Sequence, residues 1–311
     1  MNTLLKVGQS LQGRRSMYNV TKQLHKSVWL ARNDTGKPVL VKCTHQARIT
    51  NERNVLKEFQ SQTNCLRRLV DEIEEPANPP AIVLQHLDDD LSNASATQRL
   101  TTTEIKYVSK RILQALAVLH ERGYVHTDVK LDNVLVNYGS ISDGNRFTDV
   151  QLADLGNTVH VESKFCQDRD LIGAPLWRSP EAQLGLQWGP ATDLWSFGTL
   201  VISLIWGKNF FIFKPNVPLE HDEYVLKILA KYHVYFGPYP PSYSDLADDE
   251  TLAILSYIMD SVSPTDLRPF TNASKKEIST DDKEFILRIM KLDPRDRPTA
   301  KELLDDEWFN S

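Results

Sequence analysis

Two short segments of the chain contain the residue types that phosphoryl transfer requires. They are HTDVKLDN at residues 126–133 and DLG at residues 154–156. An aspartate can orient an attacking hydroxyl, a lysine can offset charge on the transferred phosphate, and Asn and Asp oxygens can hold Mg²⁺. Each residue alone would often cap a helix or lie in a solvated loop. Their order and spacing together favour a phosphoryl-transfer site.

The segments before this site have the pattern of a small sheet. Residues 28–31 and 38–41 are predicted as strands joined by the turn at 33–36, and residues 81–84 as a further strand. Apolar residues at roughly helical spacing predict a helix over residues 52–70. Residues 1–18 have no clear period and are expected to form a flexible lead-in.

The pattern turns helical in the remainder of the chain. The predicted helices span residues 103–122, 191–206, 224–232, 251–260, 281–290 and 299–308. A strand-rich first quarter followed by helices predicts an α+β fold of two lobes with a hinge near residues 85–90. The expected divisions are an N-terminal lead-in at 1–18, a small β-rich lobe at 19–87 and a larger, mainly helical lobe at 88–311.

The bulk composition is that of a globular protein. The 311 residues are 41% hydrophobic and 25% charged. The most apolar run, residues 194–206, is too short to span a bilayer and is interpreted as a buried helix. No signal peptide is found. Cys43, Cys65 and Cys166 show no metal-ligand spacing, which favours a reducing compartment and packed or exposed thiols without structural zinc.

Charge is distributed unevenly along the chain. Residues 1–70 hold 13 Lys and Arg against 3 Asp and Glu, whereas residues 71–311 hold 23 against 38. Solvated surfaces are the simpler interpretation of both regions. The alternative is a basic first part that meets an acidic partner and an acidic remainder that favours basic substrates. Neither a zinc module nor aromatic-basic interleaving supports nucleic-acid binding.

From about residue 20 to residue 309 the chain resembles the eukaryotic protein kinases. The segments at 126–133 and 154–156 are similar to the kinase catalytic loop and its metal-binding Asp-Phe-Gly motif. Further similarities are VLVK at 39–42, SPE at 179–181 and TDLWSFG at 192–198. The resemblance implies a two-lobed kinase-like fold, with ATP and Mg²⁺ as cofactors.

The resemblance also assigns roles to individual residues. It implies that Asp128 is the catalytic base, that Lys130 stabilises charge and that Lys42 grips the nucleotide α- and β-phosphates. Asn133 and Asp154 would be the Mg²⁺ ligands. Lys130, in place of the Ala-Ala-Arg of tyrosine kinases, implies Ser/Thr acceptors. The residues expected around the nucleotide are Val28, Leu40, Leu84, Gln85, Leu87, Asp90 and Leu135.

Other similar positions concern fold and subgroup. Glu181 is expected to pair with Arg297, and Asp193 to accept hydrogen bonds from the catalytic-loop backbone. Arg178, the long stretch at 215–280 and the sequence DLGN at 154–157 are most like the group of cyclin-dependent, MAP and SR-protein kinases.

The phosphate-binding loop departs from the kinase pattern. Counted back from Val28, its three glycine positions hold Thr21, Gln23 and Lys26. Glycines let backbone N–H groups approach phosphates closely, so ligand binding is expected to be weaker here. Lys22, His25 and Lys26 are an alternative source of positive charge.

Four further departures concern single positions. Leu40 replaces the small alanine that roofs the adenine, and Thr127 replaces an arginine that contacts a phosphorylated activation loop. Ala174 lies where a threonine would bridge the catalytic Asp and Lys. If the helix continues through Leu66 and Leu69, the residue paired with Lys42 is Gln62, with Glu58 one turn earlier as a substitute and Glu52 as a poorer candidate.

Two functions from different classes therefore remain open. The leading hypothesis is ATP- and Mg²⁺-dependent transfer of a phosphoryl group to Ser/Thr hydroxyls of protein substrates. The acidic region after residue 70 would favour basic substrates. The alternative is a pseudokinase that binds nucleotide weakly or not at all and acts as a scaffold or allosteric partner; a small-molecule kinase is a distant third. A regulatory protein partner and a cytoplasmic or nuclear location are expected, without nucleic acid or membrane.

Overall fold

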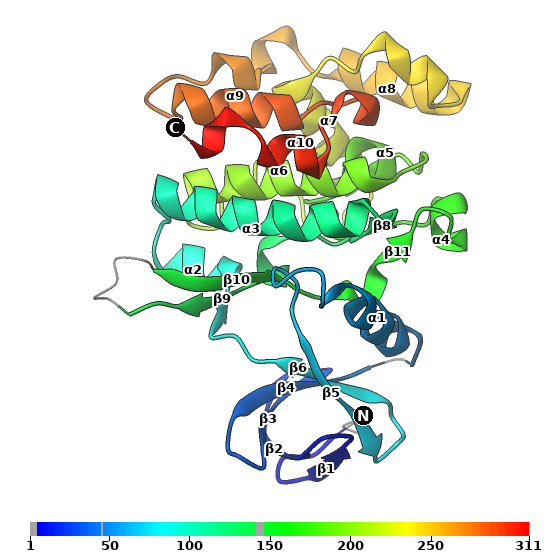
Figure 1. The fold of residues 1–311 in the computed structure, drawn as a ribbon. Helices are drawn as coiled ribbons and strands as arrows, with labels where there is room; N and C mark the ends of the chain where they lie inside the picture. The colour runs from blue at the N-terminus through cyan, green and yellow to red at the C-terminus, as the bar shows by residue number, and fades with distance from the viewer. Residues whose placement is uncertain (1–4, 45, 141–145, 311) are drawn as a thin grey trace. The chain divides into compact units, whose positions relative to one another are not determined.

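A computed structural model describes residues 5–44, 46–140 and 146–310 (Figure 1). Two compact units make up this part of the chain. Unit 1 comprises residues 1–90 and 135–158, and unit 2 comprises residues 91–134 and 159–311. Residues 1–4 of the predicted lead-in, and residues 45, 141–145 and 311, lie outside the described residues.

A closed, six-stranded antiparallel barrel forms most of unit 1 (Figure 1). Alternate side chains of its strands point inward, and Tyr18, Trp29 and Val41 are among those fully buried. The strand order is β1–β2–β3–β4–β6–β5, with bounds β1 Ser10–Gly13, β2 Met17–His25, β3 Val28–Asn33, β4 Pro38–Cys43, β5 Leu69–Glu75 and β6 Ala81–Gln85.

The expected flexible lead-in is wrong for the described residues of 1–18. Strand β1 pairs with β2 on one side and with β5 on the other, and this double pairing closes the barrel. Leu5 and Leu11 are buried in the barrel core. A four-residue strand that ends at Gly13 contributes too few alternating positions for its period to be recognised.

The helix predicted over residues 52–70 is displaced in the structure. Helix α1 spans Gln46–Phe59, and Leu69 begins strand β5. Leu66 lies between these elements and forms a bridge with Leu152. Leu66 and Leu69 are apolar because they pack in the strand region of unit 1, so apolar spacing alone extended the helix too far.

A second, smaller sheet completes unit 1. Its order is β10–β9–β7, with β7 Asp89–Asp90, β9 Val134–Tyr138 and β10 Phe147–Leu152, and the short helix η3 (Leu155–Asn157) follows it. The acidic residues 88–90, the last two of which form β7, are tied to β9: Asp88 accepts a hydrogen bond from the Tyr138 N–H, and Asp89 accepts one from the Tyr138 hydroxyl.

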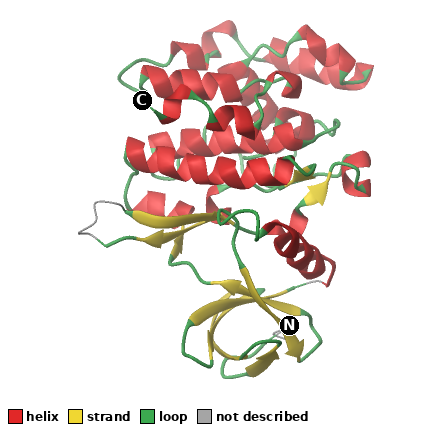
Figure 2. Cartoon of the chain, viewed as in Figure 1, coloured by secondary structure: helices red, strands yellow, loops and turns green. Residues whose placement is uncertain are grey.

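Unit 2 is mainly helical (Figure 2). Helices α3 (Thr102–His120) and α6 (Pro190–Trp206) pack side by side, and Thr101 with Glu104 forms a capping box at the start of α3. The remaining elements are α2 Leu91–Thr97, η1 Leu131–Asn133, β8 Tyr124–Val125, β11 Val159–His160, α4 Lys164–Gln167, α5 Pro180–Gln183, α7 Tyr224–Phe236, η4 Pro241–Asp245, α8 Asp249–Ser261, η5 Pro264–Asp266, η6 Phe270–Asn272, α9 Thr280–Ile289, η7 Pro294–Asp296, α10 Ala300–Leu304 and η8 Glu307–Phe309.

These elements confirm the predicted α+β class, with a β-rich first part and a mainly helical remainder. Every residue from 192 to 205 of α6 is buried, as expected for a core helix. Within the described ranges, no helix combines the length and the apolar character that crossing a membrane requires.

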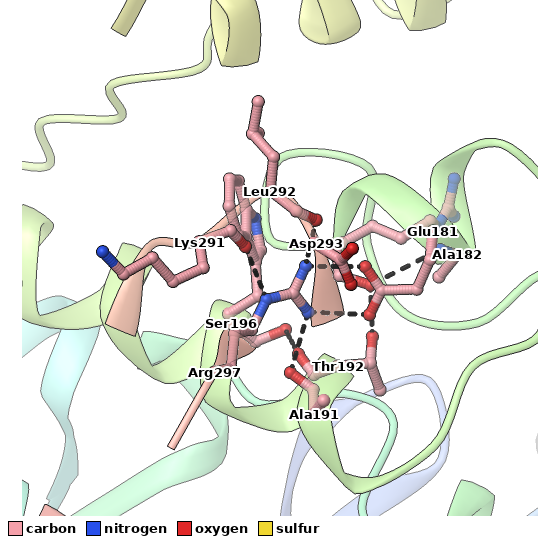
Figure 3. Close-up of polar contacts among 12 residues, drawn as sticks. Glu181, Ala182, Ala191, Thr192, Ser196, Lys291, Leu292, Asp293 and Arg297 are labelled. Atoms are coloured by element: carbon pink, nitrogen blue, oxygen red, sulfur yellow. Dashed lines mark hydrogen bonds and ion pairs between the residues drawn. The ribbon is translucent and has the colours of Figure 1, made fainter. Parts of the chain in front are cut away.

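A buried ion pair in unit 2 joins Glu181 of α5 to Arg297, the residue that follows η7 (Figure 3). The two Arg297 Nη atoms donate to the Glu181 carboxylate over 2.7 and 2.8 Å, and both side chains are at most 1% exposed. The guanidinium also donates to the carbonyl oxygens of Lys291, Leu292 and Ala191. The pairing expected from the sequence is therefore present, with every nitrogen of the guanidinium satisfied.

Replacing Arg297 by Met should lower the free energy of unfolding by about 3–5 kcal/mol, because Glu181 would remain buried without a partner. Urea denaturation of the parent and the variant measures this difference. Lys227→Met is the matched control, since Lys227 forms an exposed pair with Glu223 and its loss should cost less than about 0.5 kcal/mol. Equal losses in the two variants would contradict the structural role of the buried pair.

Cys43, Cys65 and Cys166 are all buried, and none of them forms a disulfide. Burial raises the pKa of the Cys43 thiol to about 11. Because the thiolate is the reactive form, the native protein should react with a thiol reagent such as DTNB only after unfolding. Colorimetric titration with and without urea checks this, and rapid reaction of a thiol in the native chain would contradict it.

Candidate active site

In unit 1, a lysine from strand β4 lies between two carboxylates. Lys42 Nζ is 2.7 Å from Glu52 Oε2 of helix α1 and 2.6 Å from Asp154 Oδ1, two residues after strand β10. The Lys42 side chain is 14% exposed and that of Glu52 is 1% exposed. The structure therefore brings together Lys42 and Asp154, two of the predicted site residues, and adds Glu52.

The two carboxylates keep the ammonium group charged. Burial alone would lower the pKa of Lys42, but Glu52 and Asp154 outweigh it, and the pKa is raised from its ordinary value. A lysine in this state offers a fixed positive charge to an anionic ligand at any physiological pH.

The predicted partner of Lys42 is wrong. Gln62 lies beyond the end of α1, is exposed, and donates from Nε2 to the Glu58 carbonyl oxygen. Glu52 takes the place that was assigned to Gln62, because the helix begins six residues earlier than expected and ends at Phe59. A signal was present in the sequence, since Glu52 lies on the same helical face as the buried residues Val55 and Leu56.

Asp154 is held in a strained backbone conformation. Its φ of 61° lies in the left-handed region, which is uncommon for a residue other than glycine. Helix α1 fixes the turn that follows, because Asn51 Nδ2 donates to the carbonyl oxygens of Gly156 and Thr158, over 3.2 and 2.8 Å. The same helix therefore positions both Glu52 and the Asp154 turn.

In unit 2, three predicted site residues form a cluster around η1. Lys130 Nζ donates to Asp128 Oδ2 over 2.8 Å, and Asn133 Nδ2 donates to the same oxygen over 2.9 Å. Asn133 Nδ2 also donates to the Asp128 carbonyl oxygen. These bonds fix the Asn133 amide, and its Oδ1 accepts no hydrogen bond from the residues that the structure describes, which leaves that oxygen available as a metal ligand.

The backbone before Asp128 is anchored by the buried Asp193 of α6. Its carboxylate accepts from the backbone N–H groups of His126 and Thr127, over 2.7 and 2.9 Å, and lies 2.9 Å from His120 Nε2. Thr127 has a φ of 70°, a genuine outlier for a β-branched residue. Asp193 therefore accepts the backbone hydrogen bonds that were expected of it. These bonds support the strained conformation of Thr127, the residue before the predicted base Asp128.

A narrow depression, too tight to hold a water molecule, adjoins Asp128 within unit 2. Trp177, Arg178 and Ala174 contribute to its lining. Arg178 is fixed in place, because its guanidinium donates to the carbonyl oxygens of Ile172 and Gly173 and to Gln183 Oε1. Ala174 thus lines the same depression as Asp128 but has no hydroxyl to offer it. The structure therefore agrees with the departure from the kinase pattern noted at this position.

The predicted nucleotide residues of unit 1 pair across its strands. Leu40 lies opposite Leu84, Val28 opposite Lys42, and Asp90 opposite Leu135. Residues directly opposite each other share a face of the sheet. Leu87 is buried, and the Gln85 carbonyl oxygen accepts a hydrogen bond from Arg67. The assignment of these residues to a nucleotide stays a prediction.

The hairpin of β2 and β3 contains no glycine. Residues 21–26 are all exposed, and the turn that joins the strands consists of Lys26 and Ser27. The pairing register is irregular twice, so that Lys22 lies opposite Leu30 and His25 opposite Val28. Lys22 and His25 therefore share the face of Val28 and Lys42.

Comparison with known proteins decides the family. Residues 26–309 match the family model described as the protein kinase domain. The chain belongs to the protein kinase family. This confirms the resemblance inferred from the sequence.

Individual relatives support the same assignment. The serine/threonine-protein kinase PAK mbt of Drosophila melanogaster is 34% identical over 140 residues, which cover 45% of this chain and 20% of the relative. The CTD kinase subunit alpha of Schizosaccharomyces pombe is 27% identical over 234 residues, covering 74% of this chain and 36% of the relative. The chain thus spans about a fifth to a third of the length of these curated relatives.

A solved structure shares the fold. The crystal structure of the yeast RNA Pol II CTD kinase CTDK-1 complex has a chain that matches with a TM-score of 0.76. The match covers 94% of this chain and 93% of that chain, at 20% sequence identity. At this identity, the similarity concerns the kinase fold alone.

Glu52→Ala should lower the free energy of unfolding by about 1–3 kcal/mol, because Lys42 would keep only Asp154 as a partner in a largely buried position. Gln62→Ala is the control and should change it by less than about 0.5 kcal/mol, since Gln62 is exposed. Urea unfolding of both variants measures the difference. A larger loss of stability in Gln62→Ala than in Glu52→Ala would contradict the Lys42–Glu52 pair and favour the helix predicted over residues 52–70.

Proposed function

We propose that this chain transfers the γ-phosphoryl group of ATP, with Mg²⁺, to Ser/Thr hydroxyls of protein substrates. The observation that carries the proposal is the cluster in which Lys130 and Asn133 both donate to Asp128 Oδ2. Membership of the protein kinase family and the serine/threonine kinases among its relatives support the same activity.

The side chains take separate roles in this proposal. Asp128 accepts a hydrogen bond from the substrate hydroxyl and directs it toward the phosphorus. Lys130, already within hydrogen-bond distance of Asp128, offsets the negative charge that moves during transfer. Lys42 binds the nucleotide phosphates and is held charged by Glu52 and Asp154.

Each unit also offers an oxygen donor of a kind that suits the metal. Asp154 offers a carboxylate that is 36% exposed, and Asn133 offers the amide oxygen left available by its hydrogen bonds to Asp128. Mg²⁺ is bound in proteins by such oxygens, together with substrate phosphates and water. When bound, the ion neutralises phosphate charge.

The pairing of Asp128 with Lys130 favours catalysis over mere binding. A module that only held Mg²⁺ and nucleotide would need Lys42, Asn133 and Asp154, but neither a hydroxyl-orienting acid nor a lysine beside it. Asp193 accepts a hydrogen bond from the backbone N–H of Thr127, which precedes that acid and has a strained φ, and such strain is typical of positioned catalytic groups.

A non-catalytic nucleotide-binding role is the second candidate. The exposed hairpin of residues 21–26 favours it, because side chains stand where glycines would let the backbone approach phosphates. Leu40 and Ala174 also favour this role. Leu40 is larger than the alanine expected over the adenine, and Ala174 lacks the hydroxyl expected to position the catalytic Asp and Lys.

The proposed substrate class rests on the charge of the chain, and the proposed partner and compartment rest on its similarity to protein kinases. The excess of Asp and Glu after residue 70 suits a basic protein substrate. A regulatory protein partner and a cytoplasmic or nuclear location remain predictions of the kinase resemblance. Two relatives carry CTD kinase in their names, and a protein-directed activity is the part of that description we propose for this chain.

Asp128→Asn should reduce transfer of labelled γ-phosphate to a generic basic protein by at least ~100-fold, because the amide accepts the hydroxyl proton poorly. Asp132→Asn is the matched control, since Asp132 is exposed and lies in η1, in the same segment of residues 126–133 as Asp128. It should retain activity within about twofold, because surface substitutions rarely disturb a site.

The assay separates the two candidate functions. Equal transfer by the parent and Asp128→Asn would contradict the catalytic role of Asp128. No transfer by the parent, together with an increase in melting temperature when ATP is added, would make the chain a nucleotide-binding pseudokinase.

A further inference from the structure

Glu72 of strand β5 is a buried carboxylate, with a side chain that is 11% exposed. Among the residues that the structure describes, three basic side chains converge on it. Lys57 Nζ lies 2.5 Å and Arg14 Nη1 lies 3.1 Å from its Oε1, and Arg53 Nη1 lies 3.4 Å from its Oε2. Arg53 and Lys57 both belong to helix α1, and Arg14 follows strand β1. The carboxylate therefore joins the helix to the barrel.

The sheet places Glu72 in line with Lys42. Glu72 lies directly opposite Ile82 of β6, and Ile82 lies directly opposite Lys42 of β4. Residues paired in this way share a face of the sheet, and their backbone positions are about 10 Å apart across two strand spacings. Helix α1 packs against β5 and β6. An anion and a cation of the sheet thus flank Ile82 on the face that meets the helix.

The helix carries the complementary charges at neighbouring positions. Glu52 contacts Lys42 over 2.7 Å, and Arg53, the next residue, contacts Glu72. A placement of α1 with these positions exchanged would set Glu52 beside Glu72 and the basic residues beside Lys42, so that both contacts would join like charges. The charges of sheet and helix therefore specify one orientation of α1, the one in which Glu52 meets Lys42.

We propose that Glu72 is a positioning residue that holds α1 in this orientation and thereby sets the affinity of the chain for the phosphates of its nucleotide. This inference rests on the proposed function, because it requires that Lys42 binds those phosphates. Glu72 acts through Glu52. When the charge of Glu72 is removed, the basic residues of α1 lose their buried partner, the helix is held less firmly, and the ammonium group of Lys42 is less well placed.

The test is a double-mutant cycle that joins Glu72 to Glu52. A fluorescent ATP analogue is titrated with saturating Mg²⁺ into the parent chain, Glu72→Gln, Glu52→Gln and the double variant. Glu72→Gln should raise the dissociation constant about fivefold in the parent and less than about twofold in the Glu52→Gln background, because a residue that acts through Glu52 has little effect once Glu52 is lost. Equal factors in the two backgrounds would overturn the proposal, since they are expected when Glu72 contributes only to stability.

Glu74→Gln is the matched control. Glu74 lies two residues further along β5, pairs with Arg14 over 3.2 Å and has a side chain that is 51% exposed. Its substitution removes the same charge from a neighbouring exposed position and should change the dissociation constant by less than about twofold, because exposed pairs contribute little. An increase equal to that of Glu72→Gln would attribute the effect to net charge and overturn the proposal.

Lys57→Glu covers the case in which Glu72→Gln does not fold. The Lys57 side chain is 45% exposed, and a carboxylate at this position repels Glu72 while the buried group itself stays in place. The dissociation constant should again rise about fivefold in the parent and less than about twofold in the Glu52→Gln background. No rise in the parent, or an equal rise in both backgrounds, overturns the proposal.

Failure of the proposed function gives a different result. If the parent transfers no phosphate but binds the analogue and shows the expected factors, the proposed phosphoryl transfer is wrong and the role of Glu72 stands. If the parent transfers phosphate and the factors are equal in the two backgrounds, only the role of Glu72 is wrong. If the parent does not bind the analogue, both proposals are wrong.

Discussion

A buried positive charge is the constraint on which unit 1 depends. Lys42 carries its ammonium group into a largely buried position, and this is tolerable only because Glu52 and Asp154 lie within 2.7 Å of it. Those two partners come from helix α1 and from the segment after β10, while Lys42 comes from β4. One ion cluster therefore links β4 and α1, which follow one another in the sequence, to Asp154, which lies 112 residues after Lys42.

A comparable constraint acts in unit 2. Asp193 holds two backbone N–H groups and Thr127 in a strained conformation, and this fixes the segment that carries Asp128, Lys130 and Asn133. The Arg297–Glu181 pair buries a second set of charges among the helices. In both units, buried charged groups lie where the chemistry is predicted, and apolar packing supplies most of the stability around them.

The sequence predicted the parts of the molecule that depend on local pattern. Long periodic segments such as α3 and α6 were recognised because their buried faces repeat over several turns. Spaced motifs singled out Lys42, Asp128, Lys130 and Asn133 as candidate site residues, since the chemistry restricts residue type and order. The family and the α+β class followed from these two kinds of signal.

The remaining features depend on contacts between distant segments. Strand β1 is too short to show a period, and its role appears only when it pairs with β2 and β5. The pairing of Glu52 with Lys42 was ranked too low because the predicted helix began and ended too late. Leu66 and Leu69 fit a helical spacing as well as they fit their actual places in unit 1. Nothing in the local sequence indicates that Arg67 is buried, since arginine is usually a surface residue.

The geometry implies that two carboxylates keep Lys42 charged inside unit 1 before any ligand binds. The first measurement is a titration of the Lys42 side chain by ¹³C–¹⁵N NMR in the protein without ligand. We expect the pKa of Lys42 to lie above its ordinary value. A Lys42 pKa below the ordinary value would show that burial outweighs the two carboxylates and would contradict this interpretation.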